Sequence, residues 1–479
     1  MGLIFHIDVN SAFLSWSAIE KLRNHPDEPD LRTIPAIIGG DEKTRHGVVL
    51  AKSIPAKRYG IQTGEPVANA YRKCPILVME PPDHRLYHRR SRELMQLLSS
   101  YTSDIEQVSI DECYLSYTPI SHRFSSPEAA ARHIADEVRD TLGFTVNVGI
   151  APNKLLAKMA SDFEKPDRVH TLYAEEIPQK MWPLSVRDLL MVGKSSATRL
   201  EQLGIHTIGE LACADPKFLQ AQFKSHGQMM WEFANGIDRT PLHPEAREAK
   251  GIGNSTTLAS DAESAEDAKR ILLKLSEEVS ARLREAHVLA HTVTVEIKYS
   301  DFRSCSRQTQ LSTPISTNTA LYQCACRLFA ELWNGAPIRL LGIRTTKLQS
   351  EEDPVQLSLF DGDSPLLVPE EKSGGAAPHS SHSAAQHPSP NAALHGSSGT
   401  TDASRTAAAV DRQTHAPAPA HSGIAVQPSS VSRTPSLEKQ RRLDEAMDQI
   451  RKRYGKDAIT RGSLLPPRHI SDKKDFLDT

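Results

Sequence analysis

Three carboxylates in two short apolar segments are the residues of this chain whose types and spacing best suit chemistry. Segment 6–9 (HIDV) has the pattern of a buried strand that ends with Asp8 and Val9, and segment 109–115 (SIDECYL) places Asp111 and Glu112 between apolar residues. Acids within apolar strands are costly unless their charge is compensated. Two Mg²⁺ ions that hold the attacking and leaving oxygens of a phosphoryl transfer are the usual compensation. The alternative is that an isolated Asp-Glu pair only marks a strand end or a turn.

Composition places these acids in a large protein without an overall charge preference. The 479 residues are enough for about three domains. The net charge of -2 means that any basic surface must be local. The six cysteines lack CxxC or Cys/His spacing, which indicates reduced thiols. No apolar run reaches the roughly 18 residues of a membrane span and no signal peptide is recognisable, so we expect a cytoplasmic protein.

The acids must be positioned by an N-terminal region that alternates between strand and helix patterns. We expect strands at 3–8, 34–39, 47–52, 76–79, 105–109, 112–117 and 145–151, and helices at 10–23, 84–101, 126–142 and 153–163. This alternation predicts a sheet covered by helices. Residues 173–240 read as short helices, with a tight turn at Gly193 between two of them, and the Pro- and charge-rich residues 241–250 read as a linker.

A second, smaller domain is expected at 251–349. Its pattern is β-α-β-β-α-β, the order of a ferredoxin-like unit, with paired strands at 293–298 and 308–311 and helices at 263–286 and 317–334.

The C-terminal region has two further patterns. Residues 363–435 are dominated by Ser, Ala, Pro, His, Gly and Thr, which predicts disorder. A last helix is expected at 436–460. Its apolar stripe consists of Leu443, Met447, Ile450 and Tyr454. This helix could bind a partner, fold back on the core or remain solvated.

Together these motifs resemble the Y-family DNA polymerases, most closely the bacterial DNA polymerase IV branch. The resemblance is carried by Asp8 with Phe13 five residues later, by Ser109-Ile110-Asp111-Glu112, and by segment 148–158 (VGIAPNKLLAK) followed by Lys165-Pro166. It runs in order from residue 3 to about residue 348. It implies template-directed addition of deoxynucleotides to a primer 3′ end, translesion synthesis past damaged bases, and no proofreading.

The resemblance also implies a fold class, an α+β right hand with several domains. The expected parts are a ferredoxin-like palm (1–10 and 84–172), small fingers (11–83), a helical thumb (173–240), the linker (241–250), a little finger (251–349), a clamp-binding peptide (354–362), the disordered segment and the C-terminal helix.

The resemblance assigns roles to the residues around the acids. Asp8, Asp111 and Glu112 become the catalytic carboxylates and, with the Val9 carbonyl, the ligands of two Mg²⁺ ions. Phe13 becomes the steric gate that excludes a ribose 2′-hydroxyl, although a plain core aromatic is the alternative. Lys165 corresponds to a lysine that contacts the triphosphate, for which an ammonium group is suited as a point charge.

The fingers depart from the family pattern. Polymerase IV relatives carry a tyrosine and an arginine that grip the triphosphate, and this chain has Ile54 and Lys57 at those positions. Isoleucine cannot donate a hydrogen bond, and lysine lacks the bidentate fork of arginine. Lys57 and Arg58 remain the expected nucleotide-binding residues of the fingers, with Lys52 as another candidate. The departure puts the affinity for the nucleotide in doubt and leaves the reaction class unchanged.

Two basic regions are expected to hold DNA phosphates. The Gly193-Lys194 turn resembles a helix-hairpin-helix turn, whose backbone N–H groups can bind phosphate without reading bases. In the little finger the candidates are Lys298, Arg303, Arg307, Arg339 and Arg344. A solvated sheet face is the alternative. Binding through such residues should be independent of sequence and sensitive to salt.

A short peptide after the little finger implies a protein partner. Gln356-Leu357-Ser358-Leu359-Phe360 resembles the bacterial sliding-clamp-binding pentapeptide, with Gln356, Leu357, Leu359 and Phe360 as contacts. Apolar anchors on a flexible segment usually fit a partner's groove. The implied partners are therefore primer-template DNA, deoxynucleoside triphosphates and the sliding clamp (the beta subunit of the replicative polymerase). We expect a monomer without a membrane contact.

Two other classes of function use similar residues. A nucleotidyl cyclase has a paired-carboxylate palm but needs neither a DNA-binding thumb nor a clamp peptide. A non-catalytic scaffold should have lost one of the three carboxylates, whereas this chain keeps all of them.

Overall fold

The computed structural model describes residues 2–41, 47–245, 249–353, 437–455 and 458–462. The clamp-binding peptide and the segment expected to be disordered lie outside the described residues. Among the described helices, none is both long enough and apolar enough to cross a bilayer.

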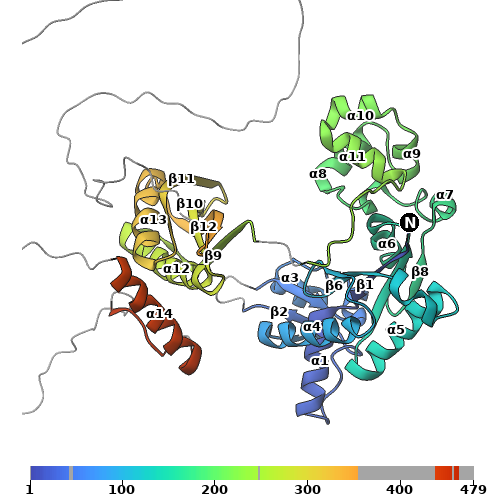
Figure 1. Ribbon diagram of the computed structural model, residues 1–479, viewed down its shortest axis with the longest axis horizontal. Coiled ribbons are helices and arrows are strands. Elements are labelled where there is room, and N and C mark those ends of the chain that lie inside the picture. The colour runs from blue at the N-terminus through green and yellow to red at the C-terminus, as the bar shows by residue number, and fades with distance from the viewer. Residues whose placement is uncertain (1, 42–46, 246–248, 354–436, 456–457, 463–479) are drawn as a thin grey trace, which may run out of the picture. The chain divides into compact units, whose positions relative to one another are not determined.

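A five-stranded sheet organises the N-terminal region (Figure 1). Its order is β5 (Ile105–Gln107), β6 (Glu112–Ser116), β1 (Ile4–Val9), β7 (Val146–Ala151) and β8 (Val169–Thr171). The central strand β1 is antiparallel to both neighbours, β6 and β7. The expected strands and helices of this region are present to within a few residues. Strand β8 was not predicted from the sequence, because it is short and depends on its parallel pairing with β7.

Helices pack on both faces of this sheet, and β1 alternates between them. Phe5, Ile7 and Val9 join the core formed with α4 (His84–Ser99) and α5 (Pro127–Leu142). The other helices of the region are α1 (Ala12–Asn24) and α6 (Lys154–Ser161), and α6 packs against β1 and β7. Because side chains alternate along a strand, His6 and Asp8 share the face opposite to Phe5 and Ile7.

Local signals define the ends of these helices. The Ser126 hydroxyl caps α5 by accepting a hydrogen bond from the Ala129 amide, and Gly143 ends this helix with a φ of 81°. Asn153 caps α6 in the same way through the Leu156 amide. The Asn153 cap sets where α6 begins and therefore which of its residues reach the acids on β1 and β6.

The expected fingers contain a three-stranded sheet in the order β3 (Val49–Lys52), β2 (Ala36–Gly39), β4 (Val78–Glu80). Two short helices, α2 (Ile54–Arg58) and α3 (Val67–Lys73), complete a small separate core. Neither helix was predicted from the sequence, because five to seven residues are too few for a helical period to be recognised. The Ser53 hydroxyl caps α2.

The expected thumb is helical, with one correction. Its helices are α7 (Ile177–Lys180), α8 (Lys194–Gln202), α9 (Ile208–Cys213), α10 (Pro216–Phe223) and α11 (Ser225–Ala234). The helix expected just before Gly193 is only a 3-10 turn at Val186–Asp188. The chain cannot continue as a helix there because Met191 adopts a left-handed conformation with a φ of 68°.

The expected little finger has four long strands in the order β11 (Ser304–Ile315), β10 (Val288–Tyr299), β12 (Ile338–Ser350), β9 (Gly251–Ala262). The strands exceed the predicted lengths because pairing in the sheet extends beyond the alternating residues. Helices α12 (Ala265–Glu285) and α13 (Asn318–Leu332) cover one face (Figure 1) and enclose the core. The C-terminal helix α14 spans Leu437–Tyr454 and ends before Gly455, which has a φ of 102°.

Candidate active site

The register of β1 and β6 pairs two of the predicted carboxylates and places the third, Asp111, next to them in the chain. Asp8 lies directly opposite Glu112 in the antiparallel pair, so both side chains project from the same face of the sheet. The Val9 amide donates a hydrogen bond to the Asp111 carbonyl over 3.1 Å, which joins the residue after Asp8 to the residue before Glu112. Residues about a hundred positions apart in the sequence therefore meet at one end of two neighbouring strands.

Two lysines from the neighbourhood of α6 contact these acids. The Lys158 ammonium lies 2.6 Å from Glu112 Oε1, and the Lys165 ammonium forms an ion pair with Asp8 and lies 2.8 Å from Asp162 Oδ1. Lys165 was expected near the site, whereas Lys158 received no role in the sequence analysis. Its signal is the four-residue spacing from Lys154 on an otherwise apolar helix, which places both lysines on the face turned toward the sheet.

His6 is a second functional candidate that sequence reasoning missed. Its ring is fully buried, and Nδ1 lies 2.8 Å from the Ser161 hydroxyl. That hydroxyl also donates a 2.8 Å hydrogen bond to the Lys158 carbonyl. The Nε2 atom of His6 faces Glu112 Oε2 at 3.8 Å. The signal in the sequence is the two-residue spacing from Asp8, which places both side chains on one face of β1.

These contacts shift the protonation of the cluster. His6 and then Lys158 lower the pKa of Glu112 to about 2, and burial opposes them. Burial raises the pKa of Asp8, although Lys165 opposes this effect. Burial by itself would lower the pKa of Lys165, but the nearby Asp8 and Asp162 outweigh it and raise the pKa. Glu112 and Lys165 are therefore both charged at neutral pH.

The donor set suits a hard divalent cation, but the side chains do not form a ready cage. Asp8, Asp111 and Glu112 offer carboxylate oxygens, the ligands that Mg²⁺ prefers. In the part of the chain that the structure describes, no three His, Cys, Asp or Glu side chains are close enough to hold a metal together. The Asp111 carboxylate accepts a 2.6 Å hydrogen bond from the Ser109 hydroxyl, while the other two acids contact lysines. Metal binding would require these lysine contacts to be exchanged.

Phe13 lies just beyond the end of β1, in the first turn of α1. Its half-buried ring stacks on the ring of Tyr87, with centroids 4.3 Å apart and planes 5° apart. The Tyr87 hydroxyl is in turn 3.1 Å from the Ser17 hydroxyl. One face of the Phe13 ring is thus fixed by packing, while part of the ring remains accessible.

Family models and known proteins match this chain. Family models match residues 7–162 (impB/mucB/samB family), 249–359 (impB/mucB/samB family C-terminal domain) and 187–238 (DNA polymerase-iota, thumb domain). The DNA polymerase IV of Clostridium acetobutylicum is 49% identical over 359 residues, which cover 75% of this chain and 90% of that protein. The DNA polymerase IV 1 of Bacillus subtilis is 39% identical over 360 residues, which cover 75% of this chain and 85% of that protein.

The chain belongs to the Y family of DNA polymerases.

A solved structure supports the same fold. The Y-family DNA polymerase chimera Dbh-Dpo4(243-245)-Dbh has a TM-score of 0.64 and 22% identity, and the match covers 73% of this chain and 99% of the chimera. The expected right-hand fold is confirmed. As a Y-family member of the polymerase IV branch, the chain is a DNA-directed DNA polymerase that acts in template-directed translesion synthesis. Its family excludes the nucleotidyl cyclase alternative.

In the fingers of this Y-family polymerase, the departures from the family pattern lie on an exposed surface. Ile54 occupies the first turn of α2, and Lys57 and Arg58 occupy its last turn. All three side chains are exposed. Ile54 and Lys57 are three residues apart and thus lie on one side of the helix. Neither residue packs into the core of the fingers, so the substitutions alter the surface and leave the fold intact.

In the thumb, Gly193 caps the N-terminus of α8 without adopting a left-handed backbone. Its φ is -74°, and an added Cβ would meet no atom within 4 Å. No side chain hydrogen-bonds to the first backbone N–H groups of the helix, which begin at Lys194. A DNA phosphate could approach these N–H groups closely because glycine has no side chain there.

In the little finger, the structure separates the expected DNA contacts. Thr294 and Lys298 alternate with the core residues of β10, and Arg344 pairs with Thr294, so Lys298 and Arg344 share the face opposite to the helices. Arg307 instead pairs with the buried Val295, and its guanidinium lies 2.8 Å from Glu331 of α13. Arg307 therefore does not lie with Lys298 and Arg344.

The remaining expected contacts surround the β10–β11 turn. Arg303 forms an ion pair with Asp301 at 2.6 Å, and Arg339 lies 4.7 Å from the centre of the exposed Phe302 ring. Lys298 contacts the same ring from 5.7 Å. Glu296, which was not considered from the sequence, lines the same hollow of the outer face as Arg344. The turn and the outer face thus carry the cations Lys298, Arg339 and Arg344 beside the acids Glu296 and Asp301.

Proposed function

We propose that this polymerase extends a primer 3′ end by a two-Mg²⁺ mechanism, with Asp8, Asp111, Glu112 and the Val9 carbonyl as ligands. The observation that carries the proposal is the strand register that pairs Asp8 with Glu112 and joins Val9 to Asp111. When bound, such ions lower the pKa of the primer hydroxyl and neutralise charge on the triphosphate and its leaving group.

The two lysines of the site have ammonium groups that can exchange a carboxylate partner for the substrate. Lys158 and Lys165 contact two of the carboxylates that a metal would need. A triphosphate offers these flexible ammonium groups alternative anionic partners. We infer that nucleotide loading transfers Lys165 from Asp8 to the triphosphate and withdraws Lys158 from Glu112. Lys57 and Arg58 of the exposed α2 surface would add further contacts to the phosphates.

Phe13 is proposed as the steric gate. Its stacking on the buried Tyr87 fixes the ring, because Tyr87 cannot withdraw from the core. A fixed ring excludes a ribose 2′-hydroxyl by steric clash, which is a reliable way to discriminate between similar substrates.

DNA would be held by contacts to phosphates. The open N-terminus of α8 and the outer face of the little finger offer backbone N–H groups and cations. Such contacts carry no base preference, which suits the copying of damaged templates. We also propose that the enzyme works without proofreading, as a monomer in the cytoplasm. The sliding clamp would bind Gln356-Leu357-Ser358-Leu359-Phe360.

Primer extension tests the catalytic proposal. The wild-type chain should extend a primer on undamaged and damaged templates in Mg²⁺, and Asp111→Asn should abolish extension while retaining primer-template binding. Asp140→Asn, on an exposed part of α5, is the matched control and should extend normally. Substantial extension by Asp111→Asn would refute the assignment of the metal ligands.

A further inference from the structure

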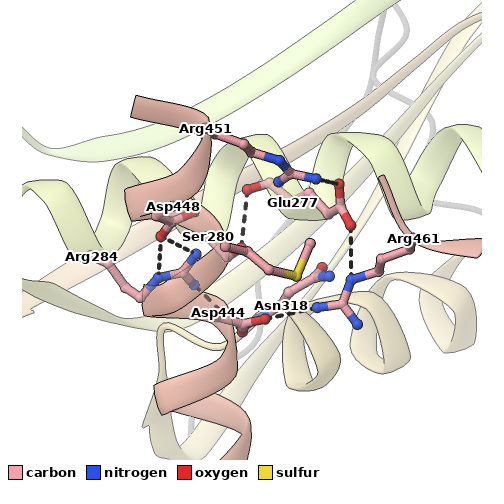
Figure 2. Close-up of a pocket in the computed structure, with 9 residues that line it drawn as sticks. Glu277, Ser280, Arg284, Asn318, Asp444, Asp448, Arg451 and Arg461 are labelled. Atoms are coloured by element: carbon pink, nitrogen blue, oxygen red, sulfur yellow. Dashed lines mark hydrogen bonds and ion pairs between the residues drawn. The ribbon is translucent and has the colours of Figure 1, made fainter. Parts of the chain in front are cut away.

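The C-terminal helix α14 lies outside the three family matches, the last of which ends at residue 359. It nevertheless docks on the little finger, against α12 and the start of α13 (Figure 2). On α14, Asp444 and Met447 are the side chains that become buried, with 4% and 7% exposure. The helix therefore folds back on the core, which was one of the three possibilities left open by the sequence.

The docking is predominantly ionic. Arg284 of α12 lies 2.6 Å from Asp448, and Glu277 of α12 lies 2.9 Å from Arg451 (Figure 2). The Asn318 amide at the start of α13 donates a 2.9 Å hydrogen bond to Asp444. Arg461, beyond the helix, lies 2.8 Å from Glu277 and 2.7 Å from Asp444. A polar face of α14 thus meets a matching polar face of the little finger.

This orientation leaves three of the four residues of the expected apolar stripe exposed to solvent. Leu443, Ile450 and Tyr454 are 54%, 37% and 67% exposed, and Met447 alone turns inward. Their spacing of seven and four residues places them along one line of the helix. We call these three residues the outer edge of α14. Ion pairs already attach the helix to the little finger, so docking gives no reason for an apolar outer edge.

The start of the outer edge lies next to the end of β12, the last described strand before the clamp-binding peptide in the sequence. Arg441, two residues before Leu443, lies 2.9 Å from Glu351, the residue that follows β12. Gln356 is five residues beyond Glu351, a distance of at most about 18 Å for an extended chain. A protein that holds the peptide is therefore within reach of α14.

The charges beside the outer edge indicate the chemistry of the partner. Arg453 is exposed in the last turn, and its guanidinium lies 5.4 Å from the Tyr454 ring centre. A second copy of α14 would bring the same bases against each other and is disfavoured. DNA would match the bases but would not use the exposed Leu443 and Ile450. An apolar protein surface with an acidic rim fits both features.

We propose that the outer edge of α14 is a second docking surface for the protein that binds Gln356-Leu357-Ser358-Leu359-Phe360. This inference rests on the proposed function of that peptide. The partner takes the peptide in one site and packs an acid-rimmed apolar surface on Leu443, Ile450 and Tyr454. Two linked contacts give an overall affinity above that of either contact, because the second forms at a high effective concentration.

Binding of the purified cognate sliding clamp to the full chain tests the proposal. Leu443→Gln with Ile450→Gln keeps the helix propensity and should raise the Kd at least roughly tenfold. Gln449→Ala, an exposed neighbour on the same helix, should bind like wild type. Undiminished binding by the edge variant would overturn the inference. If DNA affinity falls in the edge variant while clamp affinity does not, the outer edge contacts DNA and the inference is also overturned.

Two further variants separate this inference from the proposed function. Leu359→Ala with Phe360→Ala should lose clamp binding; if it binds like wild type, the peptide assignment itself fails. Asp448→Arg should release α14 by repulsion from Arg284 and weaken clamp binding as the edge variant does. Asp448→Glu keeps a carboxylate opposite Arg284 and should retain both docking, measured by hydrogen exchange of α14, and clamp affinity. Release of α14 in Asp448→Arg without loss of clamp affinity counts against the outer edge.

Discussion

At the scale of residues, the site is a balance of charge rather than a set of isolated acids. Glu112 has Lys158 on one oxygen and faces His6 with the other, and Asp8 has Lys165. Buried carboxylates require such compensation. The two lysines contact the same carboxylate oxygens that a metal ion would use. They therefore influence the binding of metal and nucleotide.

Replacement of Lys158 tests its role. Lys158→Gln removes the ammonium group that is proposed to move from Glu112 to the triphosphate, and a charge-assisted contact is worth roughly 1.5–3 kcal/mol. We expect single-turnover nucleotide addition to fall by about tenfold or more, with primer-template affinity unchanged. Lys180→Gln, an exposed lysine of α7, should leave the rate unchanged. A Lys158→Gln rate equal to wild type would show that the ion pair is only structural.

Replacement of Phe13 tests the steric gate. Phe13→Ala should raise ribonucleotide incorporation sharply, with a smaller effect on deoxynucleotides, because the ring that would clash with the 2′-hydroxyl is gone. Competitive incorporation of the two nucleotide types by the wild type and the variant measures this ratio. Phe124→Ala removes another half-buried ring of the same core, away from Tyr87, and should not change the ratio. An unchanged ratio in Phe13→Ala would leave Phe13 as a core residue.

At the scale of elements, the face of the sheet from which a basic side chain projects determines whether it is available to bind DNA. Arg344 and Arg307 belong to the same sheet, but Arg344 projects from the outer face and Arg307 pairs with Glu331 of α13. Sequence alone does not separate them, because both are arginines on strands of the little finger.

These two arginines form a matched pair for a salt-dependence test. Arg344→Ala should weaken primer-template binding and reduce the slope of log K against log salt by about 1, because one phosphate contact is lost. Arg307→Ala should leave both quantities close to wild type. Fluorescence anisotropy over a series of salt concentrations measures both. Equal effects of the two substitutions would show that the outer face is not the DNA surface.

At the scale of the whole molecule, segments beyond the polymerase core still connect to it. The family matches end at residue 359, yet α14 returns to the little finger. With its net charge of -2, the chain concentrates cations locally, on the outer face of the little finger and the outward side of α14. Partner recognition can therefore be changed without altering the catalytic residues.

The clamp-binding peptide gives a test at this scale. Leu359→Ala with Phe360→Ala should leave distributive primer extension unchanged and remove stimulation by the sliding clamp, because tethering raises local concentration without a new contact at the acids. Leu366→Ala with Leu367→Ala, a few residues later in the chain, is the matched control. Full stimulation of the Leu359 and Phe360 variant would place the clamp contact elsewhere, with α14 as the first candidate.

The sequence by itself determined the parts that depend on local pattern and on motif. The apolar segment at 6–9 predicted a buried strand, and the order of Asp8, Phe13, Asp111, Glu112 and Lys165 indicated the family. The helix predicted at 126–142 matches α5, whose ends at Ser126 and Gly143 depend on effects that act within one turn. These features need no knowledge of distant contacts.

Only the tertiary structure decided which charged groups, distant in the sequence, contact one another and which residues lie on the same face. The contacts of Glu112 with Lys158 and His6 depend on strand register and on the packing of α6. The same is true of α14. Its sequence left open whether the helix binds a partner, folds back or stays solvated, and the ionic contacts with Glu277 and Arg284 dock it with Leu443 and Ile450 exposed. Complementarity between two surfaces is a property of the pair, and neither segment carries it alone.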